Sequence, residues 1–491
     1  MNAHFNIRAY GASGAGSGKD TAAIQSAIAA CAEAGGGTVY CPPGTYVTGT
    51  IQLLSRVTLH LEAGATLLAS ADPSDYDTRC NLPGDAGYEI ERVSAAHLIH
   101  ARGASCVAVT GRGVIDGNGR AFFGPFNPAA KNSRTKSVPG WRPGQLMTFS
   151  KCRDVLLRDI TIVDSPYWAV WPFGCDGVTV DGITIRNDRE GPNTDGIDID
   201  CCRDVCVSNC RLHCGDDCFA IRSDTRRLGE DLPCENVVIT NCVLSSPCCA
   251  IRVGFAGDGP IRNCLFNNLT ITRTRTGINM LVPRYPEFSI ERGPAISDIS
   301  FQHLRMETRK AFFLCVGEDA RPPACIRNVT FSDITATTER SCFLGGSRAN
   351  PIIGLALRNV ALTVNGEMDD TAGENAPDPY PMWGSFAAGR GMPFGLYGRD
   401  LRELDLRDVR IDWGRVTGPW RNAVRLERVE RVNLAGVVAS SPPGAPAVPA
   451  VRAGHVRGLT VQGCRTHDGT GAFLDHDGCG EPVSPFPPPH V

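Results

Sequence analysis

The sequence shows no surplus of positive charge, no long apolar run and, at its start, no basic segment followed by an apolar one. The formal net charge of the 491 residues is −3, so the composition does not point to nucleic acid or to an anionic membrane as a partner. No stretch approaches the roughly 18 consecutive apolar residues of a membrane-spanning helix. Residues 1–7 lack the features of a secretion signal, and we therefore expect a cytoplasmic protein unless a signal was removed.

Also missing are facing Cys-x-x-Cys pairs at the spacing of a zinc site, although the chain has 22 cysteines. Disulfides stabilise small secreted proteins, whereas this chain is long and shows no export signal. Eleven of the cysteines lie between residues 201 and 264, on repeated segments. We therefore favour small buried thiols stacked along the repeats over disulfides and over a metal site, and we expect no cofactor.

A glycine-rich stretch at residues 11–20 does not meet the requirements of a phosphate-binding loop. Ser13 stands where that motif needs a glycine, and Asp20 stands where it needs a magnesium-binding serine or threonine. We interpret the stretch as a flexible loop that ends at Asp20, the N-cap of a helix over residues 20–35. We expect this helix to cover the first turn of the repeats that follow, because its apolar residues share one face. They are Ile24, Ala27, Ile28 and Cys31.

Helical patterns are missing between the strands that the rest of the sequence predicts. Short segments with apolar residues at every second position begin at residues 38, 57, 107, 155, 178, 205, 237, 299, 329, 355, 404, 432 and 459. Several form doublets joined by a polar corner, and two equivalent doublets begin 178 − 155 = 23 residues apart. This spacing argues against a doubly wound α/β fold and against a sandwich. It predicts a right-handed parallel β-helix with coils roughly 4.8 Å apart.

We expect one β-helix domain over residues 1–479 and a proline-rich tail over residues 480–491. Longer insertions interrupt the repeats at about 72–96, 120–143, 222–233, 281–295 and 364–396. They contain Tyr76, Tyr88, Phe122, Phe123, Trp141, Arg142, Tyr285, Tyr380 and Trp383. Aromatic faces pack against the C–H surfaces of sugars, so such loops are typical of a sugar-binding cleft, although the same residues also cover apolar loop cores.

Two equivalent segments in the middle of the repeats contain three aspartates of interest. Residues 193–200 are Asn-Thr-Asp-Gly-Ile-Asp-Ile-Asp, and residues 215–222 are Gly-Asp-Asp-Cys-Phe-Ala-Ile-Arg, at an offset of 217 − 195 = 22. With Asp195 over Asp217, this register brings Asp195, Asp216 and Asp217 into one patch at the mouths of two neighbouring strands. Repulsion between clustered carboxylates raises the pKa of one of them. Cleavage of an acetal requires one protonated and one ionised carboxyl group.

These motifs resemble those of glycoside hydrolase family 28, the polygalacturonase and rhamnogalacturonase family. The resemblance is carried by Ser165-Pro166-Tyr167-Trp168, Asn193-Thr194-Asp195-Gly196-Ile197-Asp198 and Gly215-Asp216-Asp217-Cys218, in the family's order and with its spacing. It implies that Asp216 protonates the leaving oxygen, while Asp195 and Asp217 hold and activate water. The implied function is an inverting glycoside hydrolase of pectin-like or other plant-derived oligo- or polysaccharides, with acid and base roughly 6.5–9.5 Å apart. The long loops and the expected cytoplasmic location favour action at chain ends.

Two positions depart from the family's pattern. Pro247 stands where the family has the histidine of a Gly-His-Gly rung, and residues 279–281 stand where an Arg-Ile-Lys binds the galacturonate carboxylate. Loss of two charged contacts to a buried carboxylate costs several kcal/mol, so we expect a substrate other than plain homogalacturonan. His213 either substitutes for the missing histidine or packs within its own strand.

Six residues are expected to contact the substrate: Asn193, Trp168, Arg222, Arg252, Asn279 and Tyr285. Arg222 and Arg252 occupy the same column of successive repeats, where they would clamp a differently placed carboxylate. The structural alternative is an ion-pair ladder with Asp200 on the outer face of the strands.

Two other functions remain open on the sequence. A β-helix polysaccharide lyase would need calcium and an arginine base, and its product would absorb in the ultraviolet. A catalytically inactive, carbohydrate-binding β-helix is the other alternative, because the family's histidine and its arginine–lysine pair are missing.

Overall fold

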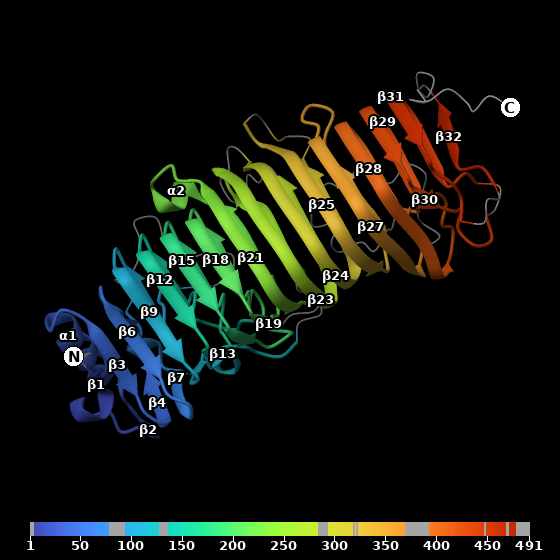
Figure 1. Ribbon diagram of the computed structural model, residues 1–491. Helices are drawn as coiled ribbons and strands as arrows, with labels where there is room; N and C mark the ends of the chain where they lie inside the picture. The colour runs from blue at the N-terminus through green and yellow to red at the C-terminus, as the bar shows by residue number, and fades with distance from the viewer. Residues whose placement is uncertain are drawn as a thin grey trace. The chain divides into compact units, whose positions relative to one another are not determined.

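The fold is the predicted right-handed parallel β-helix. The computed structural model describes residues 4–77, 94–126, 136–282, 293–317, 320, 323–368, 392–445, 448–467 and 471–477. The chain divides into two compact units, residues 1–250 and 251–491, each built almost entirely from parallel strands (Figure 1). The single domain that the sequence predicts stays a prediction, and the proline-rich tail lies outside the described residues. No helix in the described part of the chain is long and apolar enough to cross a membrane.

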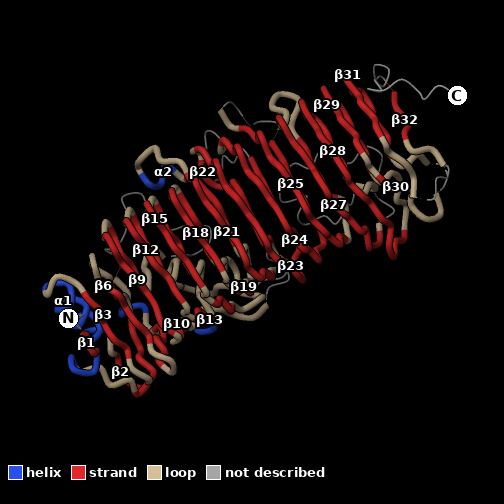
Figure 2. The backbone as a smooth tube through the Cα atoms, in the orientation of Figure 1, coloured by secondary structure: helices blue, strands red, loops and turns tan. Residues whose placement is uncertain are grey.

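In the first unit the strands form three columns, within which neighbours pair in parallel (Figures 1 and 2). One column contains β1 (His4–Asn6), β3 (Gly37–Cys41), β6 (Val57–Leu61), β9 (Ser105–Gly111), β12 (Arg153–Arg158), β15 (Asp176–Asp181), β18 (Arg203–Ser208) and β21 (Cys234–Ser245). A second contains β2 (Ala15–Lys19), β4 (Gly44–Thr48), β7 (Ala65–Ala69), β10 (Val114–Asp116), β13 (Thr161–Val163), β16 (Thr184–Arg186) and β19 (Arg211–His213). The third contains β5 (Ile51–Gln52), β8 (Ile99–Arg102), β11 (Met147–Ser150), β14 (Val170–Phe173), β17 (Ile197–Asp200) and β20 (Phe219–Ser223).

The register follows the sequence repeat. Val155 pairs with Val178, which confirms the predicted circuit of 178 − 155 = 23 residues. Later circuits are longer, because Val178 pairs with Val205 and Val205 pairs with Val237. Alternate side chains of each strand point into the core, as in β6, whose burial alternates along the strand. Asp and Asn residues with positive φ occur at many corners, where their short polar side chains tolerate the left-handed conformation.

A helix covers the N-terminal end, as predicted. α1 (Thr21–Glu33) buries the four apolar residues that the sequence placed on one face and contacts β1, β3, β5 and β6. Two details of the prediction are wrong. The Asp20 side chain makes no cap bond and instead accepts from the backbone amides of Ser13 and Gly14, at 2.6 and 3.2 Å. The loop expected to be flexible contains β2, which pairs with β4 because Asp20 holds its start in place.

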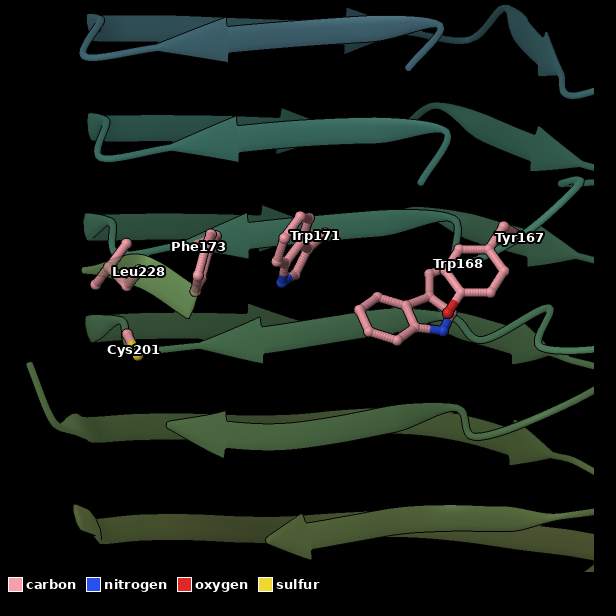
Figure 3. Close-up of a cluster of buried hydrophobic side chains, with 6 residues drawn as sticks. All are labelled: Tyr167, Trp168, Trp171, Phe173, Cys201 and Leu228. Atoms are coloured by element: carbon pink, nitrogen blue, oxygen red, sulfur yellow. The ribbon is translucent and has the colours of Figure 1, made fainter. Parts of the chain in front are cut away.

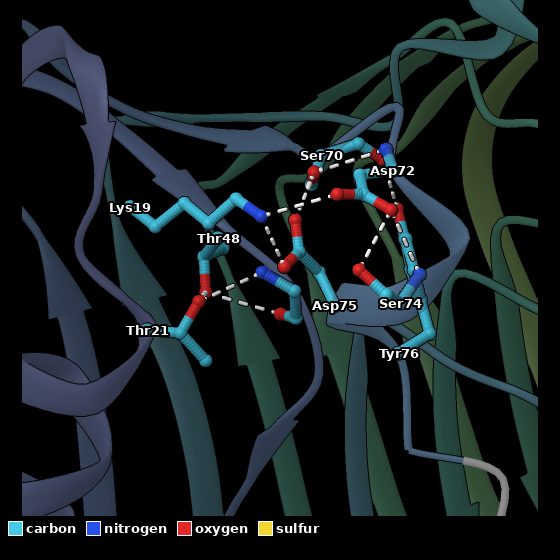
Figure 4. Close-up of polar contacts among 9 residues, drawn as sticks. Lys19, Thr21, Thr48, Ser70, Asp72, Ser74, Asp75 and Tyr76 are labelled. Atoms are coloured by element: carbon cyan, nitrogen blue, oxygen red, sulfur yellow. Dashed lines mark hydrogen bonds and ion pairs between the residues drawn. The ribbon is translucent and has the colours of Figure 1, made fainter.

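Polar contacts fix the start of α1 against the repeats (Figure 4). The Lys19 ammonium lies 2.6 Å from Asp75 and 3.3 Å from Asp72. The Thr21 hydroxyl accepts from the Gly49 amide at 2.9 Å and from the Thr48 hydroxyl at 3.2 Å. The remaining short elements of this unit are η1 (Ile7–Tyr10), η2 (Pro73–Asp75), η5 (Gly119–Ala121) and α2 (Thr225–Leu228).

The second unit is built from longer parallel strands. Its elements are β22 (Cys249–Gly257), which begins at the end of the first unit, β23 (Pro260–Val282), β24 (Ala295–Val316), β25 (Cys325–Thr338), β26 (Cys342–Gly345), β27 (Ile353–Glu367), β28 (Leu396–Thr417), β29 (Val424–Ala435), β30 (Val438–Ala439), β31 (Val451–Gln462) and β32 (Leu474–Asp477). Phe266, Phe301 and Phe331 stack in its core, with ring centroids 4.7 and 5.1 Å apart. This spacing matches the distance between neighbouring strands.

The cysteines of the described residues are thiols rather than disulfides, and most of them are buried, as the sequence predicts. Several stack on equivalent cysteines of the next coil; the Cys175 amide, for example, donates to the Cys202 sulfur at 3.3 Å. Burial raises the pKa of the Cys41 thiol to about 12. The Cys41 thiol therefore behaves as a small apolar side chain at neutral pH.

Candidate active site

Two neighbouring strands, β17 and β20, position the aspartate motifs. Ile197 pairs with Phe219 and Asp200 pairs with Arg222, which confirms the predicted offset of 219 − 197 = 22 residues. The ladder continues into the preceding turn, where the Gly196 amide donates to the Asp217 carbonyl at 2.8 Å. The turns that carry the aspartates are therefore held in register by the backbone itself.

The structure brings the three predicted catalytic aspartates together. One carboxylate oxygen from each of Asp195, Asp216 and Asp217 lies within 4.8 Å of the others. Asp195 and Asp217 are buried, whereas Asp216 is half-buried. The predicted separation of roughly 6.5–9.5 Å refers to the acid and base carboxyl groups as a whole, and it stays a prediction. The backbone ladder places Asp195 on one rung and Asp217 on the next.

The motif glycines are explained by close backbone packing beneath the cluster. A Cβ atom on Gly215 would lie 2.3 Å from the Thr194 hydroxyl, and one on Gly196 would lie 2.4 Å from the Cys218 carbonyl oxygen. The Thr194 hydroxyl accepts from the Gly215 amide at 3.1 Å and donates to the Gly191 carbonyl at 3.0 Å. Thr194 thus links the two aspartate turns, and only glycine leaves room for that link.

A buried arginine neutralises part of the charge of this cluster. The Arg222 guanidinium donates to the Asp198 carboxylate at 2.7 Å and lies 3.9 Å from the Asp195 carboxylate. Its central carbon is 4.1 Å from the centroid of the Trp168 ring. Asp200 accepts from the Asp224 amide at 2.8 Å, and the ion-pair ladder expected of Asp200, Arg222 and Arg252 stays a prediction. Sequence reasoning missed Asp198, although it lies inside the aspartate motif.

Burial and like charges both favour protons at this site. The pKa of Asp195 is raised well above its ordinary value, first by burial and then by the carboxylates of Asp198, Asp216 and Asp217. Burial also raises the pKa of Asp198, against the opposing effect of Arg222. One Asp195 oxygen and one Asp198 oxygen are buried without a hydrogen-bond partner. The arrangement therefore retains a proton on a carboxyl group and leaves acceptor oxygens for water or a hydroxyl group.

Trp168, which contacts Arg222, belongs to a cluster of buried hydrophobic side chains (Figure 3). The cluster consists of Tyr167, Trp168, Trp171, Phe173, Cys201 and Leu228. Trp168 stacks on Tyr167 with ring centroids 5.0 Å apart and is only 4% exposed. Its predicted contact with substrate stays a prediction, because in this structure its faces pack against Tyr167 and Arg222.

Comparison with known proteins assigns the chain to a family. The family model described as Glycosyl hydrolases family 28 matches residues 62–379, which is more than half of the chain. The chain belongs to this family. A second model, described as rhamnogalacturonase A/epimerase, pectate lyase-like, matches residues 4–70. Membership identifies the protein as a glycoside hydrolase, as the resemblance of its motifs predicted.

Individual relatives of this family 28 hydrolase agree with that assignment. A probable polygalacturonase of Vitis vinifera is 28% identical over 371 residues, covering 72% of this chain and 73% of the relative. An exopolygalacturonase of Platanus acerifolia is 24% identical over 385 residues, covering 74% of this chain and 90% of the relative. The solved family 28 exopolygalacturonase of Yersinia enterocolitica aligns with a TM-score of 0.65 at 20% identity, covering 88% of this chain and 78% of that one. The solved exopolygalacturonase of Thermotoga maritima aligns with a TM-score of 0.59 at 21% identity, covering 74% of this chain and 88% of that one. The two structures share the β-helix fold.

The loop that carries Asn193 in this family 28 hydrolase is tied to the insertion before β11. Asn193 has a left-handed backbone, and its side-chain oxygen accepts from the Arg142 guanidinium at 2.9 Å. Arg142 is buried and also donates to the carbonyls of Pro192 and Pro166, at 2.7 and 3.1 Å. Arg142 therefore holds the Asn193 turn in place, a role that sequence reasoning did not assign.

The rung after the two aspartate motifs departs from the family pattern at Pro247. The hydroxyl of its neighbour Ser246 donates to the Asp216 carbonyl and accepts from the Cys248 amide at 2.8 Å. His213, the proposed substitute for the missing histidine, ends β19 and pairs there with Arg186 and Ser245. Ser246 thus fixes the backbone behind Asp216, which the sequence did not indicate.

The other predicted contact residues belong to the second unit or lie outside the described residues. Arg252 is buried, and its guanidinium carbon lies 4.7 Å from the centroid of the Phe255 ring. Asn279 is fully buried on β23, where it pairs with Phe313 of β24. Tyr285, and with it Tyr88, Tyr380 and Trp383 of the insertions, lies outside the described residues.

Three of the described aromatic residues of the insertions pack on one another. Trp141 contacts Tyr76 and Phe122 with ring centroids 5.3 and 5.8 Å apart, and Tyr76 and Phe122 are buried. These three side chains cover an apolar loop core, which was the alternative to a sugar-binding role.

Proposed function

We propose that this family 28 hydrolase cleaves glycosidic bonds of pectin-type saccharides with inversion at the anomeric carbon. In this proposal Asp216 protonates the leaving oxygen, while Asp195 and Asp217 hold the attacking water. The observation that carries it is the convergence of the three carboxylates within 4.8 Å. Asp216 is the most exposed of the three, which suits the group that must reach the oxygen of a bound sugar.

The short separation supports a water shared by two carboxylates. Two oxygen atoms no more than 4.8 Å apart can both accept from one water molecule, since each O–H···O bond spans about 2.5–3.0 Å. A water held in this way is oriented and made more nucleophilic by its two acceptors. Because water rather than an aspartate attacks the anomeric carbon, a single displacement follows, and it inverts the configuration.

The electrostatics of the cluster support the supply of a proton. Burial and three neighbouring carboxylates raise the pKa of Asp195, so the cluster keeps a proton above the ordinary carboxyl range. Closely coupled carboxyl groups titrate as a unit, and the proton belongs to the cluster rather than to one residue. As it transfers to the leaving oxygen, a carboxylate remains to accept the proton that the attacking water loses.

The substrate that we propose is a pectin-type saccharide other than plain homogalacturonan, attacked from a chain end. Relatives named exopolygalacturonase support the chain-end mode and the substrate class. Two positions argue against the plain polymer, because Asn279 and Leu281 replace the two cations of the family's pattern. Arg222 and Arg252 stay the predicted residues of a differently placed carboxylate clamp, and the Arg222 guanidinium also donates to Asp198.

The test is a panel of homogalacturonan oligomers, rhamnogalacturonan fragments and neutral oligosaccharides, followed by proton NMR. We expect release from chain ends, with the first product signal in the configuration opposite to that of the cleaved bond. Initial release of the retained anomer would contradict the mechanism. Highest turnover on plain homogalacturonan would contradict the substrate proposal alone. A chelator-sensitive rise in ultraviolet absorbance would indicate a lyase, and binding without release would indicate an inactive sugar-binding protein.

The residue assignment is tested by Asp216→Asn, which removes the transferable proton but keeps the shape of the side chain. We expect hydrolysis to fall by about 10²–10⁴-fold, the usual contribution of a general acid. The matched control is Asp200→Asn, because Asp200 is buried on the neighbouring strand but is not part of the three-aspartate cluster. Unchanged turnover in Asp216→Asn, with normal turnover in the control, would overturn the assignment.

A further inference from the structure

A second group of potential ligands shares Asp217 with the catalytic cluster. One oxygen of Asp217 and the sulfur atoms of Cys248 and Cys249 all lie within 4.8 Å of one another. All three residues are buried, with exposed fractions of 2%, 4% and 0%. Neither cysteine forms a disulfide. The proposed hydrolysis uses neither thiol.

The two sulfur atoms are spaced as two ligands of one tetrahedral metal ion. They lie 3.8 Å apart. Zinc binds thiolates at about 2.3 Å, and two such bonds at the tetrahedral angle place the sulfur atoms about 3.8 Å apart. Adjacent residues of a regular strand direct their side chains to opposite faces, but Cys248 precedes β22 and lies in a bend. The bend therefore allows both thiols to reach the same point.

Backbone contacts hold this pair beside Asp217. The Cys248 amide donates to the Ser246 hydroxyl at 2.8 Å, and the same hydroxyl donates to the Asp216 carbonyl. On the other side of the pair, the Cys249 carbonyl accepts from the Cys218 amide at 2.9 Å. Ser246, before the pair, and Cys249, within it, are thus bonded to Asp216 and Cys218, the two neighbours of Asp217. The three side chains meet because the two rungs are in register.

We propose that Asp217, Cys248 and Cys249 form an inhibitory site for a thiophilic divalent cation such as Zn²⁺ or Cd²⁺. On binding, two thiols lose their protons to solvent, two metal–sulfur bonds form, and an Asp217 oxygen supplies the third ligand. A water molecule completes the tetrahedron. Sulfur ligands select soft cations, whereas the all-oxygen set of Asp195, Asp216 and Asp217 suits hard ones such as Mg²⁺ or Ca²⁺.

Inhibition follows because Asp217 belongs to both groups. A carboxylate oxygen that coordinates the cation no longer accepts from the attacking water, and the positive charge disfavours the protonated acid that hydrolysis needs. Metal binding itself does not depend on the proposed function, whereas the loss of turnover does. The two are therefore measured separately.

The experiment is a Cd²⁺ titration of the full-length, reduced enzyme, monitored by the ultraviolet thiolate-to-metal charge-transfer band and by proton release. We expect a band that saturates at one cation per chain, release of two protons, and loss of hydrolysis in proportion to occupancy. Zn²⁺ should compete with Cd²⁺, whereas Mg²⁺ and Ca²⁺ in excess should not. The double variant Cys248→Ser/Cys249→Ser should lose the band. The affinity of this variant for Cd²⁺ should fall by more than about 10–100-fold, because loss of a residue that only orients a metal ligand already costs that much.

The matched control is the other adjacent pair, Cys201→Ser/Cys202→Ser. Both of these cysteines are buried, but among the described residues they belong to no group of three closely spaced ligands. This control should keep the band and the stoichiometry of the unmodified enzyme. Absence of a band in the unmodified enzyme would overturn the proposal, as would a band that survives in Cys248→Ser/Cys249→Ser. Metal binding without any effect on turnover would overturn the inhibitory role and leave the site in place.

Discussion

Each unit contains a buried aspartate that an arginine contacts, and the two pairs differ in their balance of charge. In the second unit, Arg428 binds both oxygens of Asp400 at 2.7 and 2.8 Å, and Arg399 lies 3.4 Å from the same carboxylate. In the first unit, Arg222 binds one oxygen of Asp198 and approaches Asp195, with Asp216 and Asp217 close by. In the second unit, the positive charge of the arginines around Asp400 equals or exceeds the negative charge of its carboxylate. In the first unit, the carboxylates around Arg222 outnumber the arginine.

The difference separates a structural ion pair from a chemically active cluster. A carboxylate bound at both oxygens by arginine is held by two charge-assisted hydrogen bonds and is matched by a full counter-charge. The excess of buried carboxylates around Arg222 has the opposite effect, because it raises the pKa of Asp195 and of Asp198. The balance of charge, and not the presence of an Asp–Arg pair, therefore marks the candidate site.

Removal of the arginine from each pair should give the largest contrast in stability. Arg222→Met leaves Asp198 fully buried without its counter-charge, and we expect a loss of about 3–5 kcal/mol in the free energy of unfolding. Arg428 is 32% exposed, and Asp400 retains Arg399, so Arg428→Met should lose only about 1–2 kcal/mol. Urea unfolding of both variants at neutral pH measures the difference. Equal losses would contradict the proposed imbalance.

Much of the site followed from the sequence because strands of a β-helix repeat in register. The 22-residue offset was enough to predict that Asp195, Asp216 and Asp217 converge, and the apolar face of α1 was predicted residue by residue. The partner of Arg222 could not be predicted in this way. The residue directly opposite is Asp200, but the long arginine side chain reaches diagonally to Asp198 on the same face.

Other features escaped sequence reasoning because they depend on loops and bends rather than on the repeat. Asp20 looked like an N-cap, yet its carboxylate binds the amides of the preceding loop, and that loop is ordered as β2. The group of Asp217, Cys248 and Cys249 combines a residue of one rung with two adjacent residues of the next. A search for Cys-x-x-Cys spacing cannot find such a group, because the bend before β22 creates it.

A smaller effect is expected at Asp200, which lies beside the cluster without belonging to it. Burial, and next the Asp224 carboxylate, raise the pKa of Asp200 to about 6, above its ordinary value. The folded state therefore holds a proton that the unfolded state loses, and the stability that this proton supplies disappears as pH rises from about 4 through about 6. Asp200→Asn stays neutral and keeps the oxygen that accepts from Asp224.

Urea unfolding of Asp200→Asn and of the unmodified enzyme at about pH 4 and about pH 7 tests this linkage. The variant should gain stability relative to the unmodified enzyme over that range, on the order of 2–3 kcal/mol, since one pKa unit corresponds to about 1.4 kcal/mol. Asp400→Asn serves as a comparison in which an aspartate bound by arginine is removed, and that variant should lose stability instead. A relative gain that is absent, or that occurs on acidification, would contradict the raised pKa.

The finest test of the imbalance is Asp198→Asn, which removes one negative charge beside Asp195 and leaves the three-aspartate cluster complete. Asp198 is one of the carboxylates that raise the pKa of Asp195, so the loss of its charge lowers that pKa. Without the Asp198 charge, the positive charge of Arg222 near Asp195 is no longer partly offset, and this lowers the pKa of Asp195 further. The proton of the cluster should then dissociate at lower pH. The alkaline limb of the kcat/KM profile should therefore shift toward acid, while Asp200→Asn should leave it in place. A limb that stays fixed or moves toward alkali in Asp198→Asn would show that the charge around Arg222 does not set the protonation of the catalytic carboxyls.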